Sequence, residues 1–318
     1  MTLEPPGQTS APRLTAVLIA GPRRRLAQAS LDCLLGQTLG EMEIVLLDTE
    51  PGAPPLRRPT GIPMHEERRA FAGGQAEARS TAVGLARSPA VAFVEDHCTV
   101  APGWADAVAK AFESGPWAVV GYTFSNANDD RWAARGVHAS VYAPWMAPGV
   151  DAEVSVVATN NLAFRRDVLL ALGDRLPRMI FPDAVLQQQL LREGRRFFVS
   201  GAALCAHENP VEIGFIAAAS FTHCRAMAAR RVELWGWGWP RRLLYAVAVP
   251  LGAPLLRLWR TFAGVAGHPR RWLPVLEALP IALVTFVAGG IGESVGYLAG
   301  AGRSVDEYER YELTLDRS

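Results

Sequence analysis

The sequence lacks a charge imbalance, because 32 basic side chains face 31 acidic ones for a formal net charge of +1. Without a global positive field, binding to a polyanion through bulk charge is excluded, and we expect no nucleic-acid partner. Paired-cysteine motifs are also lacking, since Cys33, Cys98, Cys205 and Cys224 show no CxxC spacing. Free thiols favour a reducing compartment, which predicts a cytoplasmic catalytic part.

Three further signatures are missing. Neither GxGxxG nor GxxxxGK[ST] follows a predicted strand, which weakens the interpretation of the chain as a nucleotide-binding protein of the dinucleotide or P-loop type. The C-x-H and H-C spacings at 205–207 and 223–224 miss the usual gaps of zinc sites, so zinc is disfavoured. The charge-free runs 243–256 and 278–292 hold 14 and 15 residues, short of the roughly 20 that a simple membrane-spanning helix needs.

What is present is an alternation of short apolar strands with amphipathic helices. Strands are predicted at 14–20, 43–48 and 90–96, with helices near 26–35 and 75–87. This order predicts an α/β fold, in which ligands bind beyond the carboxyl ends of the strands. A helix at about 104–115 and a strand at 117–122 come next, and a second α/β passage follows at 159–173, 183–194 and 197–209.

The composition changes near residue 235. WGWGWPRR at 235–242 places three tryptophans beside two arginines, a pattern typical of a lipid-headgroup anchor. Glycines then recur every fourth residue at 292, 296 and 300, as on a close helix-packing face. We expect interfacial or re-entrant helices or a tilted hairpin at a membrane surface, although a buried pair of core helices shows similar apolarity.

These patterns divide the chain into four parts. Residues 1–13 are rich in Pro, Ser and Thr and have no apolar segment, which predicts a flexible lead-in and not a signal peptide. Residues 14–234 form the predicted catalytic α/β domain, 235–302 a membrane-associated helical region, and 303–318 a polar tail.

Five segments, in order and spacing, resemble the family 2 glycosyltransferases of GT-A fold. They are LTAVLIAGPRR, LLGQTLGEMEIVLLDTEP, GGQAEARSTAVGLARSPAVAFVEDHCTVAPGW, NNLAFRRDVLLALG and the helix after Asp183. The resemblance covers roughly residues 14–209, and WPRRLLY and GESVGYLAGAG resemble a membrane-associated subgroup of that family. It implies a Rossmann-like mixed sheet flanked by helices, followed by C-terminal apolar helices.

In this family the strand that corresponds to 90–96 usually ends in D-x-D, where this chain has Glu95, Asp96 and His97. The resemblance implies that Glu95 and His97 hold a divalent metal, that Glu95 and Asp96 contact a nucleotide-sugar, and that His207 adds a metal contact. Imidazole favours Mn²⁺ over Mg²⁺, though both are open. Without the resemblance, Glu95 and Asp96 are read as turn caps and His97 as an exposed side chain.

The resemblance places further donor contacts at strand ends. Asp48 corresponds to the family's base-binding acid, Arg79 to its A-R-N-x-G position, and Ala20 and Gly21 to the loop that passes the nucleoside. On position alone, Asp48 is as well explained as a turn former and Arg79 as a helix-surface arginine.

Asp183 lies where the family has its E-D pair. The resemblance implies that it is the general base of an inverting transfer, in which an acceptor hydroxyl attacks the anomeric carbon opposite the diphosphate. Because Asp183 directly precedes AVLQQQLLREG, it is equally suited to cap that helix. Residues 160–166, NNLAFRR, correspond to the acceptor side of the cleft.

The resemblance thus implies an inverting glycosyltransferase that moves a hexosyl or related sugar to a lipid-linked or membrane-proximal acceptor. It implies work at the cytoplasmic face of an inner membrane, as in the synthesis of cell-envelope polysaccharide. The alternative is a catalytically inactive GT-A-like binding or scaffold protein at the membrane, which Thr49, Pro182 and the irregular D-x-D fit. The enzyme interpretation requires Asp48, Glu95, His97 and Asp183 to line one crevice.

Overall fold

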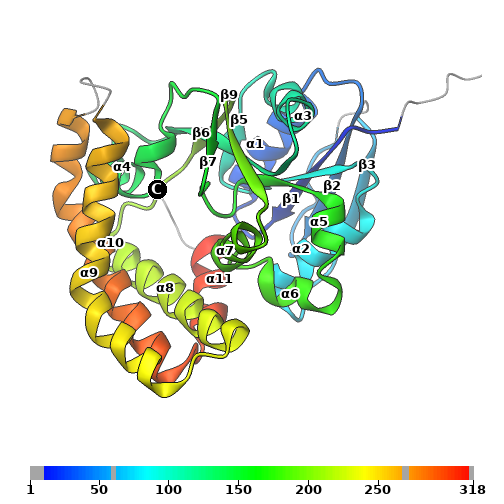
Figure 1. The fold of residues 1–318 in the computed structure, drawn as a ribbon. Coiled ribbons are helices and arrows are strands. Elements are labelled where there is room, and N and C mark those ends of the chain that lie inside the picture. The colour runs from blue at the N-terminus through cyan, green and yellow to red at the C-terminus, as the bar shows by residue number, and fades with distance from the viewer. Residues whose placement is uncertain (1–10, 59–61, 267–271, 315–318) are drawn as a thin grey trace, which may run out of the picture.

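The computed structural model describes residues 11–58, 62–266 and 272–314 (Figure 1). Most of the predicted lead-in, residues 1–10, and the last four residues of the predicted tail lie outside the described residues. The strands are β1 (Leu14–Ala20), β2 (Met42–Asp48), β3 (Met64–Arg68), β4 (Ala90–Glu95), β5 (Cys98–Val100), β6 (Trp117–Asn126), β7 (Ala152–Val154), β8 (Leu162–Arg165) and β9 (Arg196–His207).

In the described residues the strands form a nine-stranded sheet in the order β3-β2-β1-β4-β8-β6-β9-β5, with β7 paired to β9. Strands β1 to β4 run parallel, whereas β8 is antiparallel to both β4 and β6. The sheet is therefore mixed, which confirms the predicted fold class.

The helices that flank the sheet and join its strands are α1 (Arg24–Leu35), α2 (Gly74–Leu85), α3 (Trp104–Glu113), α4 (Trp132–Tyr142), α5 (Arg166–Leu170), α6 (Leu176–Met179) and α7 (Ala184–Arg192), with short 3-10 turns at Ala143–Trp145 and Gly173–Arg175. Side chains of α1 and α3 pack into one core cluster with one face of the sheet. Side chains of α2, α5, α6 and α7 pack into a second cluster on the opposite face. All seven residues of β1 and of β2 are buried, because helices cover both faces of the sheet at these strands.

The sheet has a topological switch point between β1 and β4. From β1 the chain continues to β2 and β3 on one side, and then returns to place β4 on the other side of β1. The loops after β1 and β4 therefore leave the sheet in opposite directions, and the crevice between them is the expected ligand site of an open α/β sheet.

Three long helices follow: α8 (Ile213–Trp235), α9 (Trp239–Val265) and α10 (Trp272–Ala299). Figure 1 shows them grouped at one side of the molecule, away from β1, β2 and β3. Helix α10 contacts α8, α9 and α4. On α10, Gly292 and Gly296 lie directly against the backbone of α8 at Phe221 and Arg225, which confirms the predicted close packing at those two glycines.

Two of these helices are long and apolar enough to cross a membrane, by length and composition alone, at Trp239–Ala263 and Val275–Ala299. Both helices extend past the charge-free runs of the sequence, because the flanking arginines and Glu293 continue the same helical turns. The two helices differ in burial, since 6% of the 18-residue apolar stretch of α9 is buried and 44% of the corresponding stretch of α10. Of the predicted tryptophan anchor, Trp239 is exposed but Trp237 is buried against Tyr297.

Helix α11 (Ser304–Thr314) occupies most of the predicted polar tail. It packs against α8 and α2, and Figure 1 shows it in the middle of the molecule. Its buried residues are Ser304, Tyr308 and Leu313, and Leu313 lies against Gly21 at the end of β1. The C-terminal segment is therefore part of the fold and lies next to the switch point.

Candidate active site and metal centre

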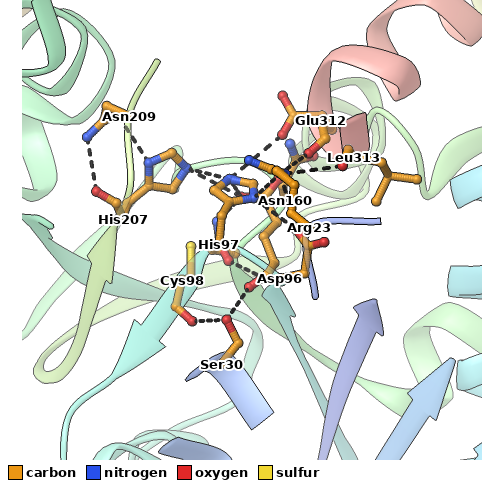
Figure 2. A network of polar contacts seen from close by, with 12 residues as sticks. Arg23, Ser30, Asp96, His97, Cys98, Asn160, His207, Asn209, Glu312 and Leu313 are labelled. Carbon is orange, nitrogen blue, oxygen red and sulfur yellow. Dashed lines mark hydrogen bonds and ion pairs between the residues drawn. The ribbon is translucent and has the colours of Figure 1, made fainter. Parts of the chain in front are cut away.

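Glu95, His97 and His207 meet in one polar cluster, and Figure 2 shows its two histidines facing each other. Glu95 ends β4 and His207 ends β9. His97 follows Glu95 by two residues, and the antiparallel pairing of Cys98 with His207 holds its backbone close to β9. The Nε2 atoms of the two histidines lie 3.2 Å apart, and they lie 3.5 and 3.6 Å from Glu95 Oε2.

Both imidazoles are oriented by their other nitrogen. His97 Nδ1 lies 3.1 Å from Asp96 Oδ1, and His207 Nδ1 lies 3.0 Å from Asn209 Oδ1. The Asn209 oxygen is an acceptor, which assigns the proton of His207 to Nδ1 and turns the Nε2 lone pair of that ring toward the Glu95 carboxylate. His97 Nδ1 lies between an acceptor, Asp96 Oδ1, and a donor, Arg23 Nη2, at 3.1 and 3.2 Å.

A divalent cation fits this arrangement. Ligands that share one ion at about 2.1 Å lie roughly 3.0 to 3.4 Å apart, close to the three distances of the cluster. Three acceptor atoms that converge in this way repel one another unless a cation or a proton lies between them. Oxygen partners on the outer nitrogens are also the usual support of metal-binding histidines. The Cys98 sulfur belongs to the same cluster, with all ligand atoms within 4.8 Å of one another.

Asp96 joins the cluster to the loop after β1. Its Oδ2 accepts a hydrogen bond of 3.0 Å from the Gly21 N–H, and its Oδ1 lies 3.3 Å from Arg23 Nη2. A Cβ built on Gly21 would lie 3.1 Å from both Asp96 Oδ2 and Leu313 Cδ2. A larger residue here would therefore have to push the Asp96 and Leu313 side chains aside, and the neighbouring Ala20 is fully buried.

Asp48 lies at the end of β2 and is held by arginines. Arg24 donates to both of its oxygens, at 2.8 and 2.9 Å, and Arg68 Nε lies 3.2 Å from Oδ2. The Asp48 side chain has no exposed surface, so its charge is neutralised inside the protein and not offered to solvent.

Arg79 is buried, which rules out the surface-helix interpretation. Both terminal nitrogens donate to the Asn160 carbonyl at 3.2 Å, and the guanidinium carbon lies 4.9 Å from the centre of the Phe93 ring. Asn160 has φ of 69°, a left-handed conformation that asparagine tolerates better than most residues.

Asp183 occupies the N-cap position of α7, but its side chain makes no capping hydrogen bond. Instead, Oδ2 accepts from the Asn160 N–H at 2.8 Å and Oδ1 accepts from Gln187 Nε2 at 3.1 Å. Burial raises the pKa of Asp183 to about 6, against the lowering effects of Arg79 and of these hydrogen bonds. Asn161 follows Asn160 in the chain and holds Glu95. Its Nδ2 donates to Glu95 Oε2, and its Oδ1 accepts from the Glu95 N–H at 2.9 Å.

Two cavities open from the cluster. One has a volume of about 190 Å³ and runs from Glu95 and His207 to the apolar helices, where Arg257 and Thr285 line its far part. Most of its wall is apolar, including Val137, Phe215, Ile216 and Ala219. The other lies at the switch point and has a volume of about 10 Å³.

The predicted site residues are thus only partly brought together. Glu95, His97 and His207 form the cluster, and Asp96 supports it. Asp48 and Asp183 line neither cavity among the described residues. Sequence reasoning missed Cys98, Asn209, Tyr308 and Glu312, which the structure places at the cluster or in the cavity walls.

Comparison with known proteins bears on the family and on the fold. Residues 23–173 match the model of the family described as glycosyl transferase family 2. Among solved structures, the fold is similar to that of a mannosyltransferase from Pyrobaculum calidifontis in complex with GDP-Man and Mn²⁺. That match has 17% identity and a TM-score of 0.52, and it covers 94% of this chain and 88% of that chain.

A second similar structure is GalNAc-T7 with UDP, GalNAc and Mn²⁺. It shares 12% identity with a TM-score of 0.46, over 61% of this chain and 42% of that chain. No curated protein matches the sequence.

Proposed function

Since residues 23–173 form a glycosyltransferase family 2 domain and the protein is a glycosyltransferase, we propose that it uses a nucleotide-sugar and a divalent cation to glycosylate an acceptor at a membrane. The observation that carries the proposal is the convergence of Glu95 Oε2, His97 Nε2 and His207 Nε2. An inactive scaffold has no need to bring three acceptor atoms together in a buried site.

Glu95, His97 and His207 are the residues that would hold the cation. Two imidazoles favour Mn²⁺ over Mg²⁺, which prefers oxygen ligands. When bound, the cation neutralises the negative charge that develops on the departing nucleoside diphosphate. The chain itself fixes the geometry, because Asp96, Asn209 and Asn161 orient the three side chains.

The donor belongs at the switch point between β1 and β4, where Ala20, Gly21 and Asp96 meet. Arg79 and Asp48 are then positioning residues beneath the nucleotide, because their charged groups are taken up by Asn160 and by Arg24 and Arg68.

We retain Asp183 as the general base of an inverting transfer. Its raised pKa, about 6, makes it a stronger base than an ordinary carboxylate while leaving it mostly ionised at neutral pH. Its bond to the Asn160 N–H lies directly behind the cavity wall, so proton transfer requires the Asn160 segment to move aside.

The acceptor is proposed to be lipid-linked or membrane-proximal. The cavity of about 190 Å³ extends from the cluster toward α8, α9 and α10 and is mostly apolar. On α9, Val247 and Leu251 are 71% and 76% exposed, an apolar face that suits lipid contact. We place the catalytic domain at the cytoplasmic face of an inner membrane, in the assembly of cell-envelope polysaccharide.

Thermal unfolding of the purified full chain tests this function. We expect one of UDP, GDP, dTDP and CDP, together with Mn²⁺, to stabilise the protein by about 2.7 kcal/mol at a hundred times its Kd. His207→Gln should abolish the Mn²⁺-dependent part of the shift. The exposed His65 supplies the matched control, since His65→Gln should leave it intact. No shift with any of the four nucleotides would contradict the proposal.

A further inference from the structure

Helix α11 lies at the carboxyl ends of β1 and β4, where the fold positions a nucleotide ligand. Arg23, in the loop after β1, donates through Nη2 to the Glu312 carbonyl at 2.6 Å and through Nε to the Leu313 carbonyl at 3.2 Å. Figure 2 shows Glu312 and Leu313 directly over Arg23, Asp96 and His97. Two hydrogen bonds from Arg23 therefore hold the last turn of α11 against the loop after β1.

Two carboxylates of α11 occupy positions that suit an anionic ligand. Glu309 Oε1 accepts the Gln75 N–H at 2.8 Å, in the first turn of α2, where the helix dipole favours negative charge. One turn further along α11, Glu312 Oε2 lies 4.0 Å from His97 Nε2 in the metal cluster. Both are positions where the negatively charged diphosphate of a nucleotide-sugar would be stabilised, one by a helix N-terminus and the other by the proposed cation.

Little space remains beside α11. The switch-point cavity of about 10 Å³ is lined by Glu312 and Leu313 from α11 and by Arg79, Asp96 and His97 from the catalytic domain. That volume holds roughly one water, whereas small-molecule sites usually measure about 300 Å³ or more.

We propose that α11 is a built-in competitor of the donor, which fills the nucleotide subsite and leaves it when a nucleotide-sugar binds. The proposal rests on the proposed function, because it needs the donor to bind at the switch point. Regulation of the site follows, since the apparent donor affinity is reduced by the fraction of molecules in which α11 is docked.

A movement of α11 would turn about its connection to α10, where Arg225 Nε donates to the Gly300 carbonyl at 2.9 Å. Gly300 and Gly302 separate α10 from α11, and both have positive φ, 76° and 54°, which glycine adopts without strain. Tyr308 anchors the helix, through a ring stack on Phe181 and a 3.0 Å hydrogen bond from Asn160 Nδ2. A shift of α11 would therefore also free Asn160, which lies between Asp183 and the acceptor cavity.

The test compares nucleotide affinity in the full-length wild type and in a variant with weakened docking, Glu309→Gln combined with Leu313→Ala. Titration calorimetry with GDP and with UDP, each with Mn²⁺, should show about tenfold tighter binding in this variant. Asp306→Asn removes a charge from an exposed position of the same helix and should change the affinity less than twofold.

Hydrogen exchange on the wild type gives a second reading that needs no variant. Binding of the nucleotide with Mn²⁺ should increase exchange in residues 304–314 and decrease it in the loop after β1. Increased protection of α11 would overturn the proposal, because α11 would then be a lid over the bound donor. Equal affinities in the wild type and the docking variant would also overturn it while leaving the proposed function standing. No binding by either protein would refute both.

Discussion

The two sides of the Glu95–His97–His207 cluster differ in what fills them. On the side of the apolar helices the chain leaves a cavity of about 190 Å³ with a mostly apolar wall. On the side of β1 and β4 it leaves about 10 Å³, because α11 lies there. A site built for an anion keeps cationic side chains inside the protein, and these must be paired whenever the anion is absent.

The charges on the two sides explain this difference. Arg23, Arg24, Arg68 and Arg79 gather around the donor side, and each is matched by Asp48, Asp96, a backbone carbonyl or the end of α11. On the acceptor side, Arg257 is the one cation among the described lining residues, and it pairs with Glu293. The charges on the proposed donor side are thus paired within the protein, whereas the proposed acceptor side is an open, mostly apolar cavity.

The largest effect on transfer is expected from substitution of Glu95, which lines both cavities. Glu95→Gln replaces an anionic metal ligand by a neutral one, and sugar transfer should fall on the order of a thousandfold. Mn²⁺ titrations and transfer rates measure the loss. Glu153→Gln removes an exposed carboxylate that pairs with Arg196 on the far edge of the sheet and should transfer at the wild-type rate. Normal Mn²⁺-dependent turnover in the Glu95→Gln protein would contradict the role of Glu95 as a metal ligand shared by the two sides.

The cluster was within reach of sequence analysis and α11 was not. Glu95, Asp96 and His97 end a buried strand, and strand ends in an α/β sheet gather at one edge, so their proximity followed from local pattern. Nothing local indicates that Glu309 and Glu312 would reach across 234 and 215 positions to Gln75 and His97. The apolar positions Val305, Tyr308 and Leu313 were the available signal, because they share a helical face.

For Asp183, the sequence predicted the position of the residue but not the direction of its side chain. Its position before α7 predicted either a cap or a base, yet the side chain turns inward to the Asn160 N–H. A left-handed Asn160 creates that partner, and backbone conformation of this kind is not encoded in composition or periodicity. Similarly, the helices α9 and α10 exceed the apolar runs, because flanking charged residues continue them.

Asp183 is bonded to Asn160, which lines the larger cavity. Its substitution is expected to have the second-largest effect on transfer. Asp183→Asn should keep nucleotide binding and lower transfer about a hundredfold, since it removes the base without altering the donor subsite. The wild-type rate should rise with pH through about 6, the pKa of this carboxyl, and the variant should lose that step. Transfer rates from pH 5 to 8 measure both, and intact turnover in Asp183→Asn would exclude Asp183 as the base.

A stability measurement on the same variant separates burial from catalysis. The pKa of Asp183 is raised from 3.8 to about 6, so the folded state holds the proton more tightly than the unfolded state. Stability from this group is therefore present below pH 4 and is lost as pH rises to about 6, by up to about 3 kcal/mol. Asp183→Asn should show a flatter stability profile over that window, whereas the exposed Asp174→Asn should follow the wild type.

The smallest effect is expected from filling the open side alone. Ala219, on α8, lines the acceptor cavity, and Ala219→Phe places a ring in it. Transfer to a lipid-linked or detergent-solubilised acceptor should fall about tenfold, which corresponds to roughly 1.4 kcal/mol of impaired acceptor binding. Hydrolysis of the nucleotide-sugar by water should stay unchanged, because water still reaches the cluster. Ala218→Phe, on the neighbouring position outside the described cavity lining, controls for added bulk on α8. Equal loss of transfer and hydrolysis would show that the two sides are not separate, and the contrast between an open acceptor side and a filled donor side would then have no functional meaning.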